Sequence, residues 1–436
     1  MMTWNEVMSL FGSGDYSGFR TEAGVMCTLL EQLGSPEKKI PFLHIAGTNG
    51  KGSASRMLQQ ILSCSGYRTG LYISPHLEFM NERWSIDGTL ISDAELRRLA
   101  SRVREVTTDA GVFPTAFELL TMMAFLFFAE HRCDIAVLEV GIGGLLDATN
   151  VIPVPECAVI MNIGLEHTEL LGNTLQEIAE KKGGIIKENG RVVLYHQTPE
   201  AEAVIRRICT SKNAALCITS PDQLLVSSSD ESGSVFSYRE HHDLTLSLAG
   251  AYQLRNVLAV LDCVDLLRKN GRSIPEAAIR SGLAGSVWPG RFEILSKKPL
   301  VILDGAHNPN GITALLQNLL EPESFLSGRR FLFVLGIMED KDYPQMLALL
   351  APHASGFFLE APENARAASA ATLKNELSRL SFSGPVFLAG SVEEALSRAL
   401  HAAAEAPDYA LVCCGSLFQV AAVRHFFKQH LTVCRC

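Results

Sequence analysis

Short, nearly continuous apolar runs alternate along the chain with segments in which apolar residues recur every three or four positions. Runs of the first kind are typical of strands buried in a parallel sheet, and segments of the second kind are typical of helices that cover it. In the first two-thirds of the chain the pattern predicts strands at Phe42–Ala46, Tyr67–Ser74, Cys133–Val140, Cys157–Ile163 and Arg191–Tyr195. It predicts helices at Glu22–Leu33, Ser53–Ser65, Asp93–Thr107, Ala116–Glu130, Gly250–Lys269 and Pro275–Ala284.

The alternation restarts near Trp288 and continues to the C-terminus with a second set of strands. These are predicted at Leu300–Asp304, Phe331–Leu335, Gly356–Leu359, Val386–Leu388 and Tyr409–Cys413. Before the restart, Leu224–Leu248 predicts a β-hairpin insertion with its turn at Ser229–Gly233. We therefore predict an α/β protein with two domains. Residues 1–287 form a P-loop-containing, mostly parallel sheet domain, and residues 288–436 form a smaller Rossmann-like, doubly wound α/β domain.

The first predicted strand runs into Gly47–Ser53, a glycine-rich loop with a single lysine. Its three glycines allow backbone N–H groups to turn inward, Lys51 adds a positive charge, and Ser53 places a hydroxyl where it can bind Mg²⁺ at a helix N-terminus. The spacing departs from the strict G-x-x-x-x-G-K-[ST] pattern because Gly52 separates the last two residues. An ordinary glycine-rich turn is the alternative, but the position between a strand and a helix favours phosphate binding.

Polar residues follow several other predicted strands of the first domain. Ser74, Glu139 and His167 lie at or just after strand ends, and open parallel sheets bind ligands beyond those ends. A hydroxyl, a carboxylate and an imidazole beside a phosphate loop suit Mg²⁺ and a nucleotide. The alternatives are a turn serine before Pro75, a structural salt bridge for Glu139 and a loop histidine.

A second polar group lies near the start of the second domain. Asp304 ends an apolar strand, His307 follows it, and Arg291 precedes it by thirteen residues. These side chains are candidates to hold the outer phosphate or the ribose of the nucleotide from an opposite wall. The alternative is an Asp–His turn with a surface arginine.

Composition narrows the class of protein. The net charge of −9 argues against a nucleic-acid partner, because binding a phosphate backbone requires a basic face. The longest apolar run, Leu119–Ala129, is too short to span a bilayer, and the N-terminus lacks the pattern of a secretory signal. Eleven cysteines without a C-x-x-C pair fit reduced thiols. We therefore expect a cytoplasmic protein without a membrane segment.

An ordered set of motifs resembles the folylpolyglutamate synthase family, whose members are often also dihydrofolate synthases and are related to the Mur ligases. The resemblance runs from about Leu29 to Leu417. The motifs are Ala46-Gly-Thr-Asn-Gly-Lys-Gly-Ser53, Ser74-Pro-His76, Asn81-Glu-Arg83, Leu138-Glu-Val-Gly-Ile-Gly-Gly144, Asp147-Ala-Thr-Asn150, Gly184-Ile-Ile-Lys187, Pro289-Gly-Arg291, Asp304-Gly-Ala-His-Asn-Pro309 and Cys414-Gly-Ser-Leu417.

The resemblance implies an ATP-dependent amide ligase. ATP would phosphorylate the γ-carboxylate of a folate, and the amine of L-glutamate would attack the acyl phosphate, releasing phosphate. The resemblance implies two Mg²⁺ ions with ligands at Ser53, Ser74, Glu139 and His167, and a CO₂-derived carbamate on Lys182 that assists the second ion. The implied ATP-binding residues are Gly47, Thr48, Asn49, Gly50, Lys51, Gly52, Ser53, Asn256, Arg291, Asp304 and His307. Lys182, His167 and Glu139 would be catalytic, in a protein expected to be a monomer.

The chain differs from the pattern of the family at several positions. Leu145 stands where many relatives have Arg, Lys181 where many have Glu, and Glu166 where Asp is usual. The segment before the phosphate loop lacks the Asp-Leu-Gly-Leu stretch that marks dihydropteroate binding in bifunctional relatives. These differences favour the addition of glutamate to folate, and not its addition to dihydropteroate, as the main activity.

Two other functions stay open at this point. A Mur-type amino-acid ligase is disfavoured because only 46 residues precede the first loop glycine, too few for a separate nucleotide-sugar-binding domain. A nucleotide-binding switch protein is disfavoured by the Asp304 and His307 cluster, because a simple switch does not need such a second wall.

Overall fold

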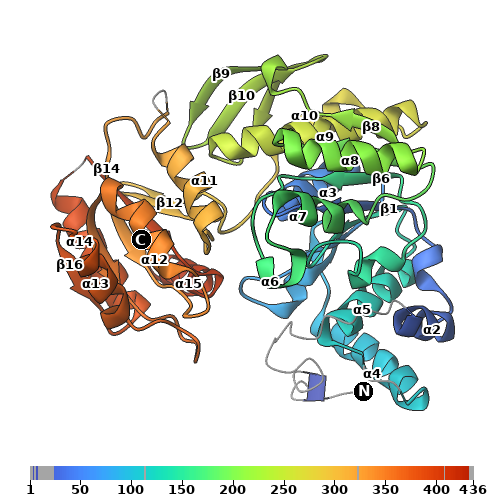
Figure 1. The fold of residues 1–436 in the computed structure, drawn as a ribbon, viewed down its shortest axis with the longest axis horizontal. Coiled ribbons are helices and arrows are strands. Elements are labelled where there is room, and N and C mark those ends of the chain that lie inside the picture. Colours follow the sequence, from blue (N-terminus) through green and yellow to red (C-terminus); the bar gives the residue numbers. More distant parts are fainter. Residues whose placement is uncertain are drawn as a thin grey trace. The chain divides into compact units, whose positions relative to one another are not determined.

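The computed structural model describes Thr3, Glu6–Val7 and residues 24–111, 114–321, 324–406 and 408–431. Its residues group into two compact units. Unit 1 comprises residues 1–225, 238–244 and 255–286, and unit 2 comprises residues 226–237, 245–254 and 287–436. Figure 1 shows the elements of both units in chain order.

Unit 1 is built on an eight-stranded sheet of order β4-β3-β2-β5-β1-β6-β7-β8. Six strands run parallel, and β3 and β4 add an antiparallel edge. In sequence order the strands are β1 (Phe42–Ala46), β2 (Thr69–Tyr72), β3 (Trp84–Ile86), β4 (Thr89–Leu90), β5 (Ile135–Glu139), β6 (Cys157–Ile160), β7 (Arg191–Leu194) and β8 (Ala215–Ile218). All five strands predicted for this part are present, whereas β3, β4 and β8 were not predicted.

Helices cover both faces of this sheet. They are α2 (Gly24–Gln32), α3 (Lys51–Cys64), α4 (Asp93–Asp109), α5 (Ala116–Glu130), α6 (Thr168–Leu171), α7 (Leu175–Gly183), α8 (Pro199–Ser211), α9 (Ala251–Lys269) and α10 (Glu276–Ala284). The predicted helix Glu22–Leu33 corresponds to α2, and its first two residues lie outside the described part. Helix α10 packs tightly on α3, because a Cβ on Gly282 would lie 2.7 Å from the Cα of Ile61.

Unit 2 contains a six-stranded sheet of order β12-β13-β17-β14-β15-β16. The strands are β12 (Glu293–Lys297), β13 (Leu300–Leu303), β14 (Arg330–Leu335), β15 (Ala354–Leu359), β16 (Val386–Leu388) and β17 (Tyr409–Cys414). Only β12 is antiparallel, and it is the strand that the apolar pattern did not predict. The helices are α11 (Pro309–Leu319), α12 (Tyr343–Leu350), α13 (Ala370–Arg379), α14 (Val392–Glu405) and α15 (Leu417–Leu431). The predicted α/β fold class is confirmed for both sheets.

The predicted hairpin at Leu224–Leu248 is instead a three-stranded antiparallel sheet. It consists of β9 (Leu224–Asp230), β10 (Gly233–Tyr238) and β11 (His241–Leu246), in the order β11-β10-β9. The second turn was missed because Arg239, which has φ +51°, carries the left-handed conformation without a glycine.

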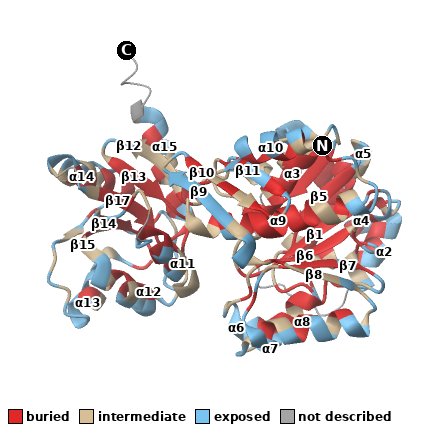
Figure 2. Ribbon diagram, turned by 90° about the horizontal axis from the view of Figure 1, so that it is seen from above, coloured by how far each residue is buried: buried red, intermediate tan, exposed pale blue. Residues whose placement is uncertain are grey.

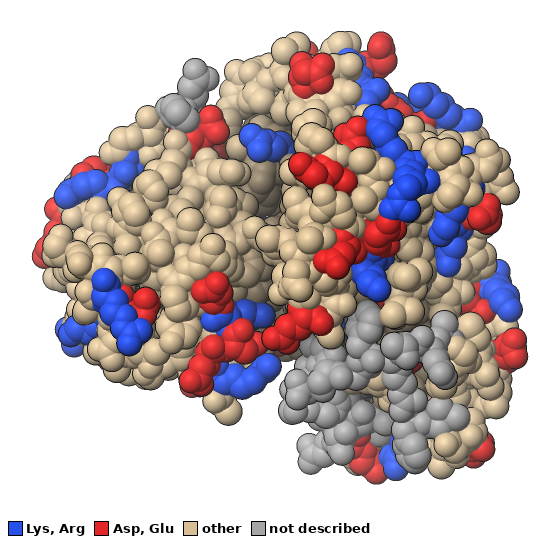
Figure 3. All heavy atoms as spheres, in the orientation of Figure 1, with Lys and Arg blue, Asp and Glu red and all other residues tan. Residues whose placement is uncertain are grey.

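Burial follows the sheets (Figure 2), whose central strands are red while the outer faces of the helices are blue. On the face drawn in Figure 3, acidic and basic side chains are interspersed. Among the described residues, none of the helices is long and apolar enough to cross a membrane.

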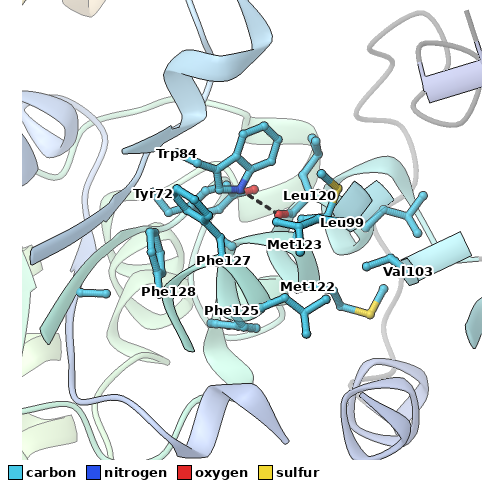
Figure 4. Packing of buried hydrophobic residues seen from close by; sticks show 14 of the residues in the cluster. Tyr72, Trp84, Leu99, Val103, Leu120, Met122, Met123, Phe125, Phe127 and Phe128 are labelled. Carbon is cyan, nitrogen blue, oxygen red and sulfur yellow. Dashed lines mark hydrogen bonds between the residues drawn. The ribbon is translucent and has the colours of Figure 1, made fainter. Parts of the chain in front are cut away.

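The largest buried side chain of unit 1 is Trp84 of β3, which packs against α5 and is drawn in Figure 4 with its neighbours. Its indole Nε1–H donates to the carbonyl of Leu120 over 3.3 Å, which satisfies the one polar atom of the ring. Tyr72 lies beside the indole, at a ring separation of 6.1 Å. The apolar run of α5 is thus a core helix, as its sequence predicts.

Glu360, directly after β15, is the most unusual buried group of unit 2. Its side chain is inaccessible to solvent, and neither carboxylate oxygen has a hydrogen-bond partner. A Cβ on Gly336 would lie 2.0 Å from its Oε1, so the carboxyl group rests directly on the neighbouring strand end. Burial raises the pKa of Glu360 from 4.5 to about 8, with a further contribution from Glu393.

We expect Glu360→Gln to stabilise the protein in alkaline solution. The folded state keeps the proton up to about pH 8, whereas the unfolded state releases it above 4.5, so stability is lost as pH rises through this window. The upper limit of that loss is roughly 5 kcal/mol, since one pKa unit corresponds to about 1.4 kcal/mol. Thermal unfolding measured from about pH 4 to about pH 9 covers this window.

Glu405→Gln is the matched control, because the Glu405 side chain is 72% exposed. Its unfolding curve should follow the wild type at every pH. Equal pH dependence of Glu360→Gln and the wild type would show that Glu360 does not carry the effect.

Candidate active site at the carboxyl edge of the parallel sheet

The glycine loop after β1 is fixed to the end of β6. The backbone N–H of Thr48 donates to the carbonyl of Asn162 over 2.7 Å, and the Thr48 hydroxyl donates to the carbonyl of Gly164 over 3.0 Å. Gly47 has φ +153°, and a Cβ there would lie 2.7 Å from the Cβ of Met161. This position therefore needs glycine for close packing between two strand ends.

The loop ends at Gly50, which is the N-cap of α3. Gly50 has φ +87°, and a Cβ there would lie 2.6 Å from Oδ1 of Asn256 in α9. The structure thus brings together Gly50 and Asn256, which were both predicted to bind ATP. The helix starts two residues earlier than predicted, so Lys51, Gly52 and the buried Ser53 form its first turn. Unpaired N–H groups of such a first turn attract anions.

The ammonium group of Lys51 lies over the same loop. Its Nζ donates to the carbonyls of Gly47 and Thr48, at 3.0 and 3.2 Å. Asn49 lies between these residues and Gly50, so the predicted loop residues form one continuous cradle. A phosphate placed there would meet a cation and a helix N-terminus together.

Ser74 and Glu139 meet beyond the adjacent strands β2 and β5. The backbone N–H of Ser74 donates to Oε2 of Glu139 over 3.2 Å. Parallel pairing of Tyr72 with Leu138 fixes this meeting, because it aligns the two strand ends. Glu139 is only 5% exposed, so its carboxylate faces a site with little water.

His167 lies farther out, on the loop that begins α6. It has φ +49° and a side chain that is 39% exposed, and its Nε2 lies 3.8 Å from Oε1 of Glu166. The structure therefore places His167 beside Glu166.

Lys182 is the buried lysine of α7, with 2% of its surface exposed. Burial, together with the nearby positive charge of Lys51, lowers the pKa of Lys182 from 10.5 to about 7. Glu166 and Asp147 act in the opposite direction. Near neutral pH a large share of this side chain is therefore an uncharged amine, the form that can react with CO₂.

These residues fit an oxygen-preferring divalent cation and a carbamate. Glu139 offers a buried carboxylate, Ser53 and Ser74 offer hydroxyls, and a carbamate would give Lys182 an anionic oxygen donor. Three or more His, Cys, Asp or Glu side chains do not cluster anywhere in the described part to hold a metal. Only Glu139 and His167 of the predicted ligand set belong to those types.

Asp147 was not predicted as a site residue, although it begins a motif noted in the sequence. Its Oδ2 accepts from the N–H of Ile142 over 3.0 Å, and its Oδ1 accepts from the N–H of Thr149 over 3.0 Å. Asp147 thus fixes the loop that follows Glu139. Periodicity could not reveal this role, because both partners are backbone groups.

In unit 2, Asp304 follows β13 and joins three segments. Its Oδ2 accepts from the N–H of Phe292 at 2.8 Å and from the hydroxyl of Tyr252 at 3.1 Å, and its Oδ1 accepts from the N–H of Ala306 at 2.8 Å. Burial raises its pKa, and Arg291 opposes that shift. Tyr252, in the first turn of α9, was not predicted.

His307 is oriented by its own turn. Its Nδ1 lies 2.8 Å from the carbonyl of Gly305, so this nitrogen carries the proton that it donates. Arg291 lies against the same turn, because a Cβ on Gly305 would lie 3.4 Å from its guanidinium. The three predicted residues of unit 2 therefore gather at one strand end.

An open cavity of about 600 Å³ lies in unit 1 next to the Ser74–His76 segment. The lining residues are His76, Glu78, Phe79, Met80, Asn81, Leu90, Ile91 and Asp93.

The protonation of His76 follows from its neighbour Arg83. Arg83 donates through Nε to Nδ1 of His76 over 2.9 Å, so the other ring nitrogen carries the proton. Burial, assisted by Arg83, lowers the pKa of His76 to about 4.

Both parts of the chain match known domain families. Residues 45–264 match the Mur ligase middle domain, and residues 290–417 match the Mur ligase, glutamate ligase domain.

Several curated proteins are similar over most of their length. A dihydrofolate synthase/folylpolyglutamate synthase of Bacillus subtilis is 37% identical over 346 residues, covering 76% of this chain and 79% of the relative. The folylpolyglutamate synthase of Lacticaseibacillus casei is 35% identical over 420 residues, covering 91% and 92%.

Solved structures agree. The Mycobacterium tuberculosis folylpolyglutamate synthase with ADP and AMPPCP has a TM-score of 0.83 at 31% identity, covering 94% of this chain and 96% of that chain. An FPGS–AMPPCP–folate complex has a TM-score of 0.82 at 32% identity, covering 97% and 99%.

Gly50→Ala should weaken ATP binding by at least about tenfold, which is about 1.4 kcal/mol. The added methyl group is disfavoured at φ +87° and meets Asn256. Titration with ATP and Mg²⁺ by calorimetry measures the effect.

Gly66→Ala is the matched control. Gly66 has φ +89° with open space around its Cβ position, so it carries the same backbone strain without the collision. Both variants should lose stability through backbone strain, and Gly66→Ala should bind ATP like the wild type. Equal ATP affinity in the two variants would contradict the proposed cradle.

Proposed function

The chain belongs to the folylpolyglutamate synthase/dihydrofolate synthase family of Mur ligases, and we propose that the residues at its strand ends carry out the ligation typical of that family. It is an ATP-dependent ligase that adds L-glutamate to the γ-carboxylate of folate through an acyl phosphate. The observation that carries this function is similarity over both domains together with a built phosphate cradle at Gly47–Ser53. Folate and ATP are its small-molecule substrates.

The phosphate cradle would bind the ATP phosphates. Lys51 and the first turn of α3 would offset the negative charge on the transferred phosphoryl group, which must approach an anionic carboxylate. Asn256, close to Gly50, would hold the nucleotide from α9. Arg291, Asp304 and His307 would contribute to ATP binding from unit 2, where Tyr252 and two backbone N–H groups fix Asp304.

Ser53, Ser74, Glu139, His167 and a carbamate on Lys182 would hold two Mg²⁺ ions. Bound Mg²⁺ supplies charge neutralisation for the two anions that react. The burial of Lys182 supports the carbamate, since it favours the uncharged amine. We propose Lys182, His167 and Glu139 as the catalytic residues.

The cavity beside Ser74 would receive the folate. Phe79, which is 62% exposed, offers an aromatic face to the flat pterin or aminobenzoyl rings. His76 stays neutral and carries its proton on Nε2, so it would act as a hydrogen-bond donor. Glu82 holds the segment, because its carboxylate accepts from the N–H groups of Leu77, Glu78 and Phe79.

Dihydropteroate is the second candidate acceptor of glutamate, because two of the relatives are named for both activities, dihydrofolate synthase and folylpolyglutamate synthase. ADP release from ATP and Mg²⁺ should be measured with L-glutamate plus tetrahydrofolate, dihydropteroate or a UDP-muramyl peptide. Stimulation by tetrahydrofolate is expected. Stimulation by dihydropteroate alone would make the protein a dihydrofolate synthase, and stimulation by neither pterin would overturn the proposal.

We also propose a cytoplasmic monomer without a nucleic-acid or membrane partner. Its ATP-binding domain would comprise residues 1–287 and its ligase domain residues 288–436. Nine cysteines in the described residues are free thiols, which supports a reducing compartment. The net charge of −9, together with the interspersed charges on the face drawn in Figure 3, supports the absence of a nucleic-acid partner.

Lys182→Ala should nearly abolish turnover and leave ATP binding intact, because the variant loses the proposed carbamate and keeps the cradle. Lys181→Ala is the matched control and should retain turnover. NMR of protein equilibrated with isotope-labelled bicarbonate should show a carbamate signal in the wild type and in Lys181→Ala. Wild-type turnover in Lys182→Ala would remove the carbamate from the mechanism.

Phe79→Ala should raise the KM for tetrahydrofolate about tenfold, equivalent to about 1.4 kcal/mol, and leave the KM for ATP unchanged. Leu225→Ala is the control, since Leu225 is 68% exposed in β9 and does not line the cavity. An unchanged KM for tetrahydrofolate in Phe79→Ala would place the folate elsewhere.

A further inference from the structure

His44 is a histidine in the centre of the eight-stranded sheet of unit 1. It lies in β1, between β5 and β6, and its side chain is inaccessible to solvent. Burial lowers its pKa to about 3, so the ring is neutral. A strand position of this kind is usually filled by Val, Ile or Leu.

The ring of His44 is joined to the loop that follows Glu139 by a continuous line of hydrogen bonds. Its Nε2 lies 2.8 Å from Oγ1 of Thr149, and that hydroxyl donates to Oδ1 of Asp147 over 2.5 Å. Thr149 lies in the short 3₁₀ helix η3 (Ala148–Val151). Both Thr149 and Asp147 are buried.

The direction of the protons follows from the acceptor at the end of the line. Burial raises the pKa of Asp147, whereas hydrogen bonds from the Thr149 hydroxyl and from the backbone N–H groups of Ile142, Thr149 and Gly141 oppose that shift. Because three N–H groups already donate to this carboxyl group, its oxygen is the acceptor in the hydrogen bond with the Thr149 hydroxyl. The Thr149 hydroxyl therefore gives its proton to Asp147 and accepts from Nε2–H of His44. This assignment leaves Nδ1 of His44 as a buried acceptor without a hydrogen-bond partner.

An unpartnered buried nitrogen costs free energy, so packing alone does not explain a histidine at this position. A histidine is explained at this position if the hydrogen bond from its Nε2–H to the Thr149 hydroxyl is needed. The line of donors ends at the Asp147 carboxylate, which also accepts from the backbone N–H groups of Gly141 and Ile142, the residues two and three positions after Glu139. Asp147 also lies within electrostatic reach of Lys182.

We propose that His44 is a positioning residue for the divalent-cation site, acting through Thr149 and Asp147 on the loop after Glu139. The inference rests on the proposed function, in which Glu139 and Lys182 help to hold the cation. His44 does not touch substrate or cation in this scheme. It fixes the hydroxyl of Thr149, which fixes the carboxylate that holds the loop.

The test compares His44→Leu, Thr149→Val and the double variant. Mn²⁺ is the probe, and its affinity in the presence of AMPPCP is measured by electron paramagnetic resonance. Each single variant should bind Mn²⁺ about 10- to 100-fold more weakly, the range found when groups behind metal ligands are removed. The double variant should be no weaker than the worse single variant, because both changes break one line.

Two further readouts separate positioning from a structural role. Thermal unfolding of His44→Leu should occur no earlier than in the wild type, because the variant removes a buried unpartnered nitrogen. Raising Mg²⁺ should restore most of its turnover. Lower thermal stability with an unchanged Mg²⁺ requirement would overturn the proposal.

Conservative variants and a matched control complete the design. His44→Gln retains a donor near Nε2 and Thr149→Ser retains the hydroxyl, so both should recover most of the Mn²⁺ affinity. Thr121→Val removes another buried hydroxyl in the same unit, one that donates to Phe117, and should bind Mn²⁺ like the wild type. If His44→Leu does not fold, Thr149→Val and Thr149→Ser decide the question.

The outcomes distinguish this inference from the proposed function. Weaker Mn²⁺ binding in Thr149→Val, in a protein whose wild type releases no ADP with either pterin, would support the positioning role and overturn the ligase proposal. Wild-type Mn²⁺ affinity in both single variants, or losses that multiply in the double variant, would overturn the positioning role.

Discussion

The first unit depends on bringing several charged groups to one edge of a sheet where little water can reach them. Parallel strands align their carboxyl ends, so β1, β2, β5 and β6 deliver Lys51, Ser74, Glu139 and the loop toward His167 to a common edge. Removing water strengthens every electrostatic interaction there. The exclusion of water also lowers the pKa of Lys182, and the positive charge of Lys51 contributes to the same shift. A reaction between two anions benefits from such a place, because the charges that offset them are already fixed.

The sequence predicted what depends on local pattern. The apolar runs identified the central strands of both sheets, and the glycine loop identified the phosphate cradle, because both are written in consecutive residues. The pattern failed where regular alternation is absent, as in the two-residue strand β4 and in β12, or where Arg239 makes a turn without glycine. Partners far apart in the chain were equally invisible, since His44 and Thr149 are 105 residues apart.

Glycine illustrates the same limit from another side. Gly50 and Gly282 look alike in the sequence, and both exclude a side chain in the structure. Gly50 does so with φ +87° at a helix N-terminus beside Asn256, whereas Gly282 does so to let α10 approach α3. Only the first arrangement points N–H groups at a ligand site. The neighbouring lysine and serine were therefore the informative signal, and the glycine alone was not.

His44 and Glu360 show how a buried polar group can be interpreted by its connections. Both are inaccessible to solvent and both have unpartnered polar atoms, and in each case burial shifts the pKa so that the neutral form prevails near pH 7. His44 is connected by hydrogen bonds through Thr149 and Asp147 to the loop after Glu139. In our proposal, the free energy lost by burying its ring is offset by the fixed geometry of that loop. The Glu360 carboxyl group has no hydrogen-bond partner through which it could act, so we expect its burial to affect only the stability of unit 2. Burying a polar side chain costs free energy of folding. We infer a functional role for such a side chain only where hydrogen bonds connect it to the proposed site, as they do for His44.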